Sequence, residues 1–369
     1  MNFNKYRSIF LLSIITVLVS LFFWFGFYLN VPSRLGFPDT TLETVFANYD
    51  GPNYMVIAKC GYDKSCIGSN FSLPQPLEYY PAHLPGFPLL IKYFSFFTST
   101  PKAMLLTSLF GSIFFSLTSF YFYKLFLKEK SSLYLAIFTI FFPARLLALR
   151  LVGAPETWFI GAILLSIILF KKNRFFLSAL LGAFALLLKS PGILLFGVYG
   201  LLFLKNRNLR YTWYLLIPAT ALGIFYAYFL QTGDFWAYFN SGDNRHLNPL
   251  PYLVFVSNST WINTIWLEDL VYIYLIAIYG LHRLFKKYKY DIIVLFPLVY
   301  TLAAIFVAHR DISRYIAPAY PFFILAFSKF LLKKNVKIIF LLLLPAIILY
   351  TINFIIGNTA PIADWTPYL

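Results

Sequence analysis

One aspartate in the sequence, Asp50, has the setting of a carboxylate that could do acid–base chemistry. It opens the turn Asp50-Gly51-Pro52, in which the aspartate and the proline mark the start of a helix. Apolar residues follow at helical spacing over 54–58, so the pattern predicts an amphipathic helix that lies on the outer surface of a membrane. Asp50 could cap this helix, or it could act as a general base that takes a proton from a hydroxyl group. Both roles stay open at this point.

Cations gather in a second segment, where they could bind a phosphate. His309, Arg310 and Arg314 fall within six residues, together with one acid. Lys189 is a further candidate, because it precedes a Ser-Pro pair between two apolar runs. A guanidinium group binds phosphate through two parallel hydrogen bonds, which favours the arginines. The alternative is a plain interfacial loop whose long basic side chains extend into water.

More polar residues could contact a substrate. They are Glu78, His83, Glu156, Arg245 and His246. Glu156 also has a structural explanation, since it falls in the first turn of an apolar run, where a helix N-terminus favours an acid. Arg145 and Arg150 lie in the preceding run, and we expect them to pair with Glu156 or Asp311 to offset the cost of burial. A single histidine in an aromatic loop, as His83 is, more often has a structural role.

The two cysteines, Cys60 and Cys66, both belong to the segment 29–102. In an oxidising compartment they can form a disulfide, and two free thiols are the alternative. The sequence has no CxxC, HExxH or clustered-histidine pattern, so we expect no zinc site. No cofactor is predicted, and a divalent cation held by carboxylates such as Asp50 stays open.

The elements that must position these residues are membrane helices. Hydrophobic residues make up 60% of the 369 positions and charged residues 12%, whereas soluble domains are roughly 45–50% apolar and ~25% charged. A soluble globule could not bury this much apolar surface. We therefore expect an all-α polytopic membrane protein with a single domain over 1–369. The net charge of +16 would suggest nucleic acid in a soluble protein, but the distribution of the charges argues against that partner here.

The apolar runs predict eleven membrane spans. They cover 8–28, 103–123, 132–149, 154–170, 175–188, 190–204, 211–230, 270–283, 291–308, 313–331 and 338–355. The first run is too long for the apolar core of a signal peptide, so we expect a retained span with the N-terminus in the cytoplasm. The runs 175–188 and 190–204 are short, and we interpret them as a tight pair of helices that meets at Lys189-Ser190-Pro191, where the proline resists a continuous helix.

Charge asymmetry sets the predicted orientation. When the runs alternate across the membrane, nineteen of the 30 basic residues fall on one side with two acids, and positive residues favour the cytoplasm. These basic residues lie within 5–7, 124–130, 171–174, 205–210, 283–289 and 329–337. The segments 29–102, 231–269 and 356–369 then lie on the outer side. The first of these outer loops carries short amphipathic pieces at 42–58 and 86–97, and loops of this length are usually functional or disordered.

Three segments of the first outer loop resemble the GT-C membrane glycosyltransferases. They are Tyr49-Asp50, the run Ile57-Ala58-Lys59-Cys60-Gly61-Tyr62, and the stretch from Tyr80-Pro81 to Pro88-Leu89-Leu90. The combination is most similar to the branch related to the GPI-anchor mannosyltransferase PIG-V and its prokaryotic relatives. Weaker similarity continues over 154–159, 189–192 and 314–321. The sequence departs from the family pattern at Tyr49, where the family has tryptophan, at Lys189, where it has arginine, and in an expanded element around His83.

The resemblance implies a chemistry and assigns residues to it. A sugar passes from a polyprenyl or dolichyl phosphate to a hydroxyl of a glycan, lipid or protein, with inversion, on the non-cytoplasmic face. Asp50 is the implied base, and cations at the outer edge of the membrane must stabilise the phosphate leaving group. The candidates are Arg310, Arg314, His309 and Lys189. Membrane lipids are the other expected partners, and frequent Phe, Ile, Lys and Asn favour a prokaryotic plasma membrane.

Two rival functions fit the same composition. A secondary transporter of a small solute or lipid-linked molecule would need ionisable residues near the middle of the bilayer, whereas the charges here crowd the outer edge. A non-catalytic membrane scaffold would not need an aspartate in the setting of Asp50. A flux assay and the variant Asp50→Asn distinguish these functions from an enzyme.

Overall fold

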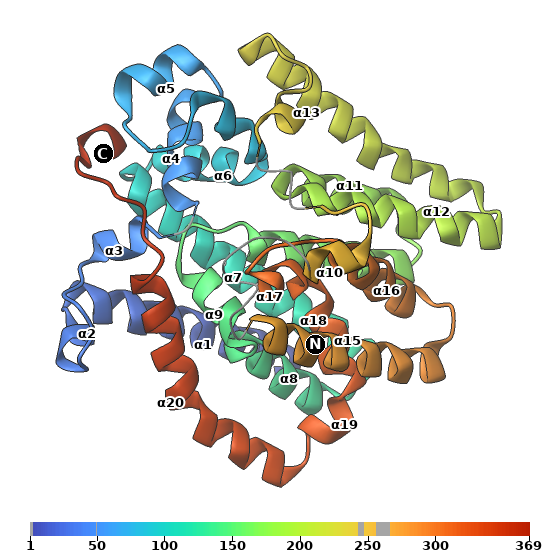
Figure 1. The fold of residues 1–369 in the computed structure, drawn as a ribbon. Coiled ribbons are helices and arrows are strands. Elements are labelled where there is room, and N and C mark those ends of the chain that lie inside the picture. The colour runs from blue at the N-terminus through green and yellow to red at the C-terminus, as the bar shows by residue number, and fades with distance from the viewer. Residues whose placement is uncertain (1–2, 49, 243–246, 256–265) are drawn as a thin grey trace.

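The structure, a computed structural model, describes residues 3–48, 50–242, 247–255 and 266–369. Within these ranges the chain forms helices joined by turns and loops, with two isolated β-bridges that join Asn48 to Thr359 and Leu247 to Val307. Figure 1 shows the helices packed side by side. The all-helical class predicted from the sequence is therefore confirmed.

The helices differ widely in length. The long ones are α1 (Phe3–Tyr28), α7 (Thr100–Lys124), α13 (Leu216–Thr232), α15 (Trp266–Tyr288) and α20 (Lys334–Ile356). Shorter ones in the middle of the chain are α8 (Glu129–Phe141), α9 (Ala144–Leu151), α10 (Glu156–Lys171), α11 (Phe175–Leu188), η2 (Ser190–Ile193), α12 (Leu194–Asn206), η3 (Leu209–Leu215) and α14 (Ala237–Asn240). Toward the C-terminus follow η5 (Pro251–Phe255), α16 (Ile292–Ala304), α17 (Ile312–Tyr315), η7 (Ala317–Ala319), α18 (Tyr320–Ala326), α19 (Ser328–Leu331) and η8 (Thr366–Tyr368).

Four helical segments of the described chain are long and apolar enough to cross a membrane. They are Tyr6–Tyr28, Thr100–Lys124, Leu209–Thr232 and Lys334–Ile356. Helices α8 and α9 would add a fifth span if taken together, although the pair is bent by 73°. These segments fit a membrane protein. The prediction of eleven spans is wrong, because most of the other apolar runs form shorter or broken helices, and α15, although long, is not among the segments apolar enough to cross.

Prolines mark the breaks in several apolar runs that do not become full-length spans, although α16 and α20 continue through Pro297 and Pro345. Pro143 separates α8 from α9, and Pro191 lies between α11 and α12, where the sequence predicts a break. The run 313–331 divides into short pieces around Pro318 and Pro321. Helix α11 has 14 residues, which makes it about 21 Å long, whereas the apolar core of a bilayer is about 30 Å thick. Neighbouring helices cover much of these pieces, so lipid does not surround them over their whole length.

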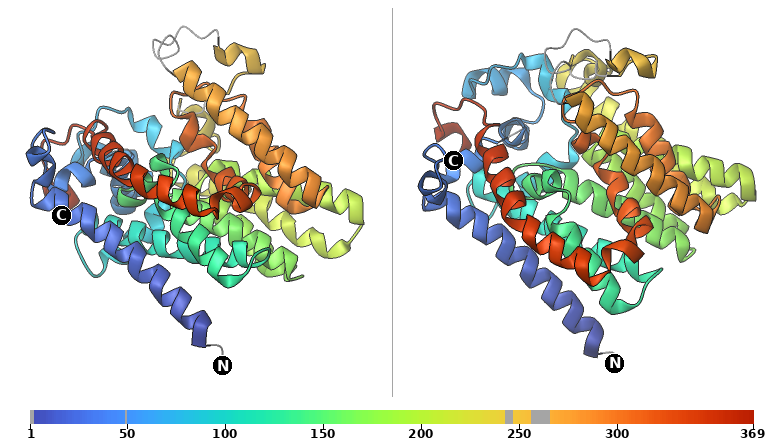
Figure 2. Two further views of the ribbon diagram at one scale, coloured as in Figure 1. Left: turned by 90° about the horizontal axis from the view of Figure 1, so that it is seen from below. Right: turned by 60° about the horizontal axis from the view of Figure 1, so that its bottom comes forward.

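Helices α7, α10 and α11 form the packed centre of the molecule. Most residues of α10 are buried, and this helix lies against both α7 and α11. The contact between α7 and α10 is close, because a side-chain carbon added at Gly111 would come within 2.6 Å of Trp158. Helices α1 and α20 lie at the edge (Figure 2) and expose large apolar side chains such as Leu18 and Leu342. Exposed apolar faces of this kind suit contact with lipid.

Polar contacts join residues that the charge pattern places on one side of the membrane. Ser8 donates a hydrogen bond to Glu129, and Lys124 pairs with the same carboxylate. Lys171 pairs with Asp291. The four charged residues belong to the predicted inner side, and Ser8 begins the first predicted span at that side. Both groups of contacts are therefore consistent with the predicted sides. The side of the membrane that each group faces stays a prediction.

The first predicted outer loop is a folded layer of short helices. It contains α2 (Val31–Arg34), α3 (Leu42–Phe46), α4 (Gly51–Cys60), α5 (Lys64–Asn70), the 3₁₀ helix η1 (Leu77–Ala82) and α6 (Gly86–Ser95). The prediction of a surface helix over 54–58 is wrong, because every residue from Gly51 to Ala58 is buried. Helix α4 packs against α6 and α7, so neighbouring elements cover both its polar and its apolar sides.

The C-terminal tail, 357–369, folds back over this layer (Figure 1). Ala360 donates its backbone N–H to the carbonyl of Ala47, and Lys59 Nζ donates to the carbonyl of Pro367. The ring of Tyr368 is buried and lies edge-on to Phe71, with 5.0 Å between the ring centroids. The tail and the first loop therefore lie together, as their shared side in the prediction requires.

Candidate functional site

Asp50 occupies the N-cap position of α4, yet its side chain does not cap the helix. Within the described structure its carboxylate accepts no capping hydrogen bond from the backbone of α4. Asp63 shows the contrast, because it caps α5 and accepts hydrogen bonds from the backbone N–H groups of Ser65 and Cys66. The carboxylate of Asp50 is instead turned toward other side chains.

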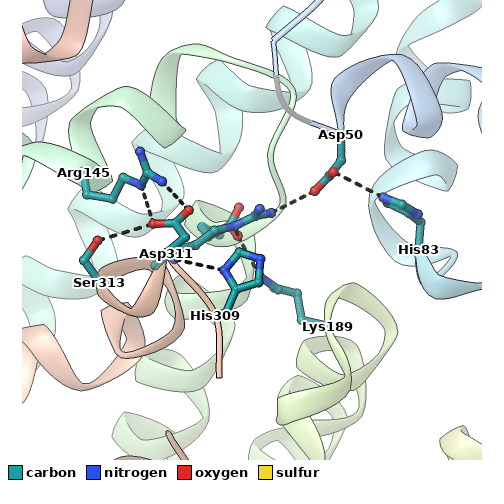
Figure 3. Close-up of polar contacts among 9 residues, drawn as sticks. Asp50, His83, Arg145, Lys189, His309, Asp311 and Ser313 are labelled. Atoms are coloured by element: carbon teal, nitrogen blue, oxygen red, sulfur yellow. Dashed lines mark hydrogen bonds and ion pairs between the residues drawn. The ribbon is translucent and has the colours of Figure 1, made fainter. Parts of the chain in front are cut away.

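Two side chains from distant segments face the carboxylate of Asp50 (Figure 3). Arg314, in α17, donates a hydrogen bond from Nη2 to Oδ2 at 3.2 Å. His83, which follows η1, places its Nε2 3.7 Å from Oδ1. The side chain of Asp50 keeps 28% of its surface exposed. A substrate can therefore reach a carboxylate that is already in contact with a cation.

Glu156 is the second carboxylate of the site, and 2% of its side chain is exposed. The first turn of α10 holds it at the end of a buried helix. Its Oε1 accepts hydrogen bonds from Lys189 Nζ at 2.7 Å and from Arg314 Nε at 2.6 Å. Its Oε2 is buried without a hydrogen-bond partner in the part of the chain that the structure describes. Two cations thus offset the cost of burying one carboxylate.

Arg314 joins the two carboxylates into one group, which we call the Asp50 cluster. Its members are Asp50, His83, Glu156, Lys189 and Arg314. The two acids and the two permanent cations of the cluster balance in formal charge. Burial opposes the ionised form of Asp50, but the contact with His83 and the charge of Arg314 outweigh burial and hold the pKa of Asp50 well below its usual range. Asp50 is therefore ionised near neutral pH.

A buried ion pair lies next to the cluster. Arg145, in α9, donates from Nε to Asp311 Oδ1 at 2.7 Å and makes a second contact through Nη2 (Figure 3). The guanidinium of Arg145 also lies over the ring of Phe354, 3.5 Å from its centroid. The backbone N–H of Asp311 donates to Nδ1 of His309 at 3.0 Å. These contacts fix the start of the short helix that carries Arg314.

Aromatic rings line the other side of the cluster, around His83. The ring centroid of His83 lies 4.9 Å from that of Tyr54 and 5.2 Å from that of Tyr79. Tyr54 in turn contacts Phe87, with 5.0 Å between centroids. The hydroxyl of Tyr62 donates to the backbone carbonyl of His83 at 2.7 Å. The imidazole is therefore held in place, and apolar ring faces lie near the carboxylate.

Five of the predicted site residues meet in the Asp50 cluster, and others lie apart from it. His309 lies beside the cluster, with its ring centroid 5.0 Å from that of Tyr315. Arg310 is exposed and has no ion-pair partner among the described residues, so no contact brings it to the site. Glu78 is exposed too and pairs with Lys64 at 2.9 Å. Two predicted residues, Arg245 and His246, fall outside the described part of the chain.

The structure shows the partners of the two arginines before α10 and of the two cysteines. The predicted pairing is confirmed for Arg145 and wrong for Arg150. Arg145 pairs with Asp311, one of the two partners predicted for it. Arg150 pairs with neither predicted acid, and its guanidinium donates instead to the carbonyl of Ser112 and to Ser116 Oγ. Cys60 and Cys66 are linked by a disulfide, which ties α4 to α5.

Sequence reasoning underrated Glu156 and missed two aromatic residues. Glu156 binds both cations of the cluster, but in the sequence a helix N-terminus explains an acid at that position equally well. Tyr54 and Tyr79 contact His83, yet the sequence has 28 tyrosines and gives no means to choose between them. The one signal in the sequence was an acid directly after a proline, at the start of an apolar run.

A cavity of about 480 Å³ opens beside the first-loop layer. Its walls come from α4, α6, α13 and the end of α11, and they are mostly apolar. Tyr62, whose hydroxyl binds the carbonyl of His83, and Pro85, two positions after His83, line one part of it. Lys92 and Gln231 supply polar groups. An apolar groove of this kind suits a ligand with a hydrocarbon chain.

Neither a cluster of metal ligands in the described residues nor a match to a known protein identifies the chemistry of the site. In the described chain no three His, Cys, Asp or Glu side chains gather as a group that could hold a metal ion. No family model matches the sequence, and no curated protein matches it either. The chemistry of the site must therefore follow from the residues that line it.

Proposed function

We propose that the protein is a GT-C-type membrane glycosyltransferase, similar to the PIG-V-like mannosyltransferase branch. It transfers a sugar from a polyprenyl or dolichyl phosphate to an acceptor hydroxyl, with inversion. The observation that carries the proposal is the position of Asp50, a part-exposed carboxylate that does not cap its helix and lies 3.2 Å from an arginine. Transfer from a lipid phosphate needs a base at the acceptor and positive charge at the leaving group.

The reaction is a single displacement at the anomeric carbon. The acceptor oxygen forms a bond to that carbon while the bond from the carbon to the phosphate oxygen breaks. The electron pair of the broken bond stays on the phosphate, and the proton of the acceptor hydroxyl passes to the carboxylate of Asp50. Attack from the face opposite the leaving group inverts the configuration of the sugar.

Arg314 and Lys189 are the cations best placed for the phosphate. Both contact the buried Glu156, which holds them on the same side of Asp50. Arg314 can offer N–H groups to a phosphate, because a guanidinium has five donors, of which Nε–H binds Glu156 and one on Nη2 binds Asp50. His309 lies beside them and could extend the site, whereas the exposed Arg310 is a weaker candidate.

The apolar chain of the donor fits the apolar helices and the apolar cavity of this protein. A polyprenyl phosphate resides in the bilayer, so an enzyme that uses it needs apolar helices such as those of this protein. The cavity between α4, α6 and α13 offers apolar walls near the His83 side of the cluster. We place the cluster on the outer face of a prokaryotic plasma membrane, with the N-terminus in the cytoplasm, which is the orientation that the charge pattern of the sequence predicts.

Transfer of label from lipid-linked sugars tests the function directly. Purified protein in lipid nanodiscs is incubated with radiolabelled polyprenyl-phosphate sugars and a membrane extract that supplies acceptors. We expect label to leave the lipid with the wild type and not with Asp50→Asn, while Asp63→Asn serves as a matched control from the same layer. Transfer by Asp50→Asn at the wild-type rate removes Asp50 as the base.

The rival transporter function gives a different set of results. In proteoliposomes it would show solute flux, with no release of label from any lipid-linked sugar. That combination would replace the proposal of an enzyme.

A further inference from the structure

Arg314 is hydrogen-bonded to both carboxylates of the Asp50 cluster, and the two bonds are unequal. Its Nε lies 2.6 Å from Glu156, whose side chain is 2% exposed. Its Nη2 lies 3.2 Å from Asp50, whose side chain is 28% exposed. The longer contact at the more exposed group is the weaker one, since water competes for it and screens it. A ligand that displaces one of the two carboxylates from Arg314 therefore displaces Asp50.

The rest of Arg314 is held in place. Its helix, α17, follows directly after Asp311, which pairs with Arg145 of α9. Its Nε is bound to Glu156, and Lys189 contacts the same carboxylate oxygen at 2.7 Å. The outer nitrogens of the guanidinium can therefore change partner while Nε and the helix stay where they are.

The groups that face Asp50 decide how well it can accept a proton. They are His83, Tyr54, Lys189 and Arg314, and Glu156 is joined to Asp50 through Arg314. Burial favours the protonated form of Asp50, but the contact with His83 and the charge of Arg314 prevail and hold its pKa well below the usual range. A carboxylate in that state is a weak general base, because proton acceptance falls as the pKa falls. Loss of the contact with Arg314 makes Asp50 a better base.

We propose that Arg314 makes the reaction ordered, with the donor binding before the acceptor. The phosphate of the donor takes Nη2–H of Arg314 from Asp50, and the freed carboxylate then accepts a hydrogen bond from the acceptor hydroxyl. This inference rests on the proposed function and adds an order of binding that the transfer chemistry does not itself require.

The charges of the reaction fit this exchange of partners. The donor phosphate carries one negative charge as a diester and gains a second when the sugar leaves, which strengthens its contact with Arg314. Asp50 meanwhile takes the proton of the acceptor. When the polyprenyl phosphate departs, Arg314 returns to Asp50 and the carboxyl group releases its proton to water. The resting cluster is restored without another reactant.

Farnesyl phosphate, an isoprenyl phosphate without a sugar, tests the exchange in the absence of turnover. Infrared difference spectra follow the pH at which the carboxyl group of Asp50 is half protonated, and Asp50→Asn identifies its band. Saturating farnesyl phosphate is expected to raise this midpoint by about 1–3 pH units, the size of effect that an opposite charge exerts on a nearby carboxylate. Farnesol, which has the same chain and no phosphate, is expected to leave it unchanged. An unchanged midpoint with farnesyl phosphate bound overturns the proposal.

Arg314→Lys separates the exchange of partners from the bare negative charge of the ligand. A lysine keeps a cation beside Glu156 but lacks the planar fork that reaches two carboxylates at once. We expect a raised midpoint for Asp50 before ligand is added and a much smaller rise when farnesyl phosphate saturates the variant. A rise as large as in the wild type would mean that the phosphate acts on Asp50 directly, and it would remove the role of Arg314.

Inhibition kinetics test the order itself once an acceptor is identified. An acceptor with its reactive hydroxyl replaced by hydrogen is expected to inhibit the wild type uncompetitively against the donor, and Arg314→Lys noncompetitively. A noncompetitive pattern in the wild type overturns the order and leaves the transferase proposal intact. If no donor supports transfer, the proposed function fails, and the farnesyl phosphate experiment still decides whether Arg314 couples phosphate binding to Asp50.

Discussion

Glu156 and Arg314 are 158 positions apart in the chain and share a hydrogen bond of 2.6 Å. The bond joins the start of the buried helix α10 to the short helix α17, and through Arg314 it extends to Asp50 in the first-loop layer. The buried carboxylate of Glu156 binds both Lys189 and Arg314, so it joins α10 to the turn between α11 and η2 and to α17. Glu156 is thus a structural support of the site, whereas Asp50 is the carboxylate that a substrate can reach.

Glu156→Gln should destabilise the protein strongly. The substitution removes the buried counter-charge of Lys189 and Arg314, and loss of one partner of a buried ion pair costs about 3–5 kcal/mol. Thermal unfolding in nanodiscs measures the loss. Glu78→Gln is the control, since its exposed pair with Lys64 is worth about 0–1 kcal/mol at most. Equal melting temperatures for the two variants would contradict the supporting role of Glu156.

The pH dependence of the protein follows from the direction of the shift at Asp50. Burial raises the pKa of Asp50, but His83 and Arg314 lower it by more than burial raises it. The pKa in the folded protein therefore lies below the unfolded value of about 3.9. The ionised carboxylate therefore stabilises the fold above about pH 4, and this contribution is lost as pH falls through the folded pKa.

The lowered pKa of Asp50 also predicts how catalysis depends on pH. Protonation of Asp50 in the free enzyme should cause no loss of kcat/KM between about pH 5 and pH 8, because its pKa lies well below that window. In Arg314→Lys the loss on the acid side should begin at a higher pH. Profiles of kcat/KM for both proteins give the measurement, and coincident acid limbs would show that Arg314 does not control Asp50.

Asp311→Asn should weaken phosphate binding although Asp311 is not a proposed ligand. The substitution breaks the pair with Arg145 that fixes the start of α17, and small misplacement of a binding group costs about 10–100-fold. Titration with farnesyl phosphate measures the affinity. Asp234→Asn is the control, as Asp234 bonds locally to the backbone of Trp236. Unchanged affinity in Asp311→Asn would show that α17 needs no such anchor.

Tyr368→Ala should loosen the first-loop layer. Tyr368 is buried between Phe71 and Trp365, and removal of a buried aromatic ring costs about 3–5 kcal/mol. Amide hydrogen exchange over 51–70 should speed up in this variant, while Tyr368→Phe keeps the ring and should match the wild type. Unaltered exchange in Tyr368→Ala would mean that the tail does not support the layer.

The local sequence pattern predicted some features of the fold correctly and others wrongly. The break at Pro191 was predicted, because proline lacks a backbone N–H and disfavours the helical conformation of the residue before it. The span count was wrong, because a short apolar run looks the same whether lipid or other helices cover it. The surface helix over 54–58 was wrong for a similar reason: the residues that cover the remaining faces of α4 come from α6 and α7.

Taken alone, the sequence determined an apolar helical chain, and it singled out Asp50, Lys189 and Arg314 as candidates. These follow from composition and from neighbours in the chain, which act over a few residues. Tertiary structure alone decided that Arg314 lies between Asp50 and Glu156, that Arg310 is excluded from the cluster, and that Asp50 does not cap its helix. Such contacts join segments more than a hundred residues apart, and their strength depends on distance and burial, which exist only once the chain has folded.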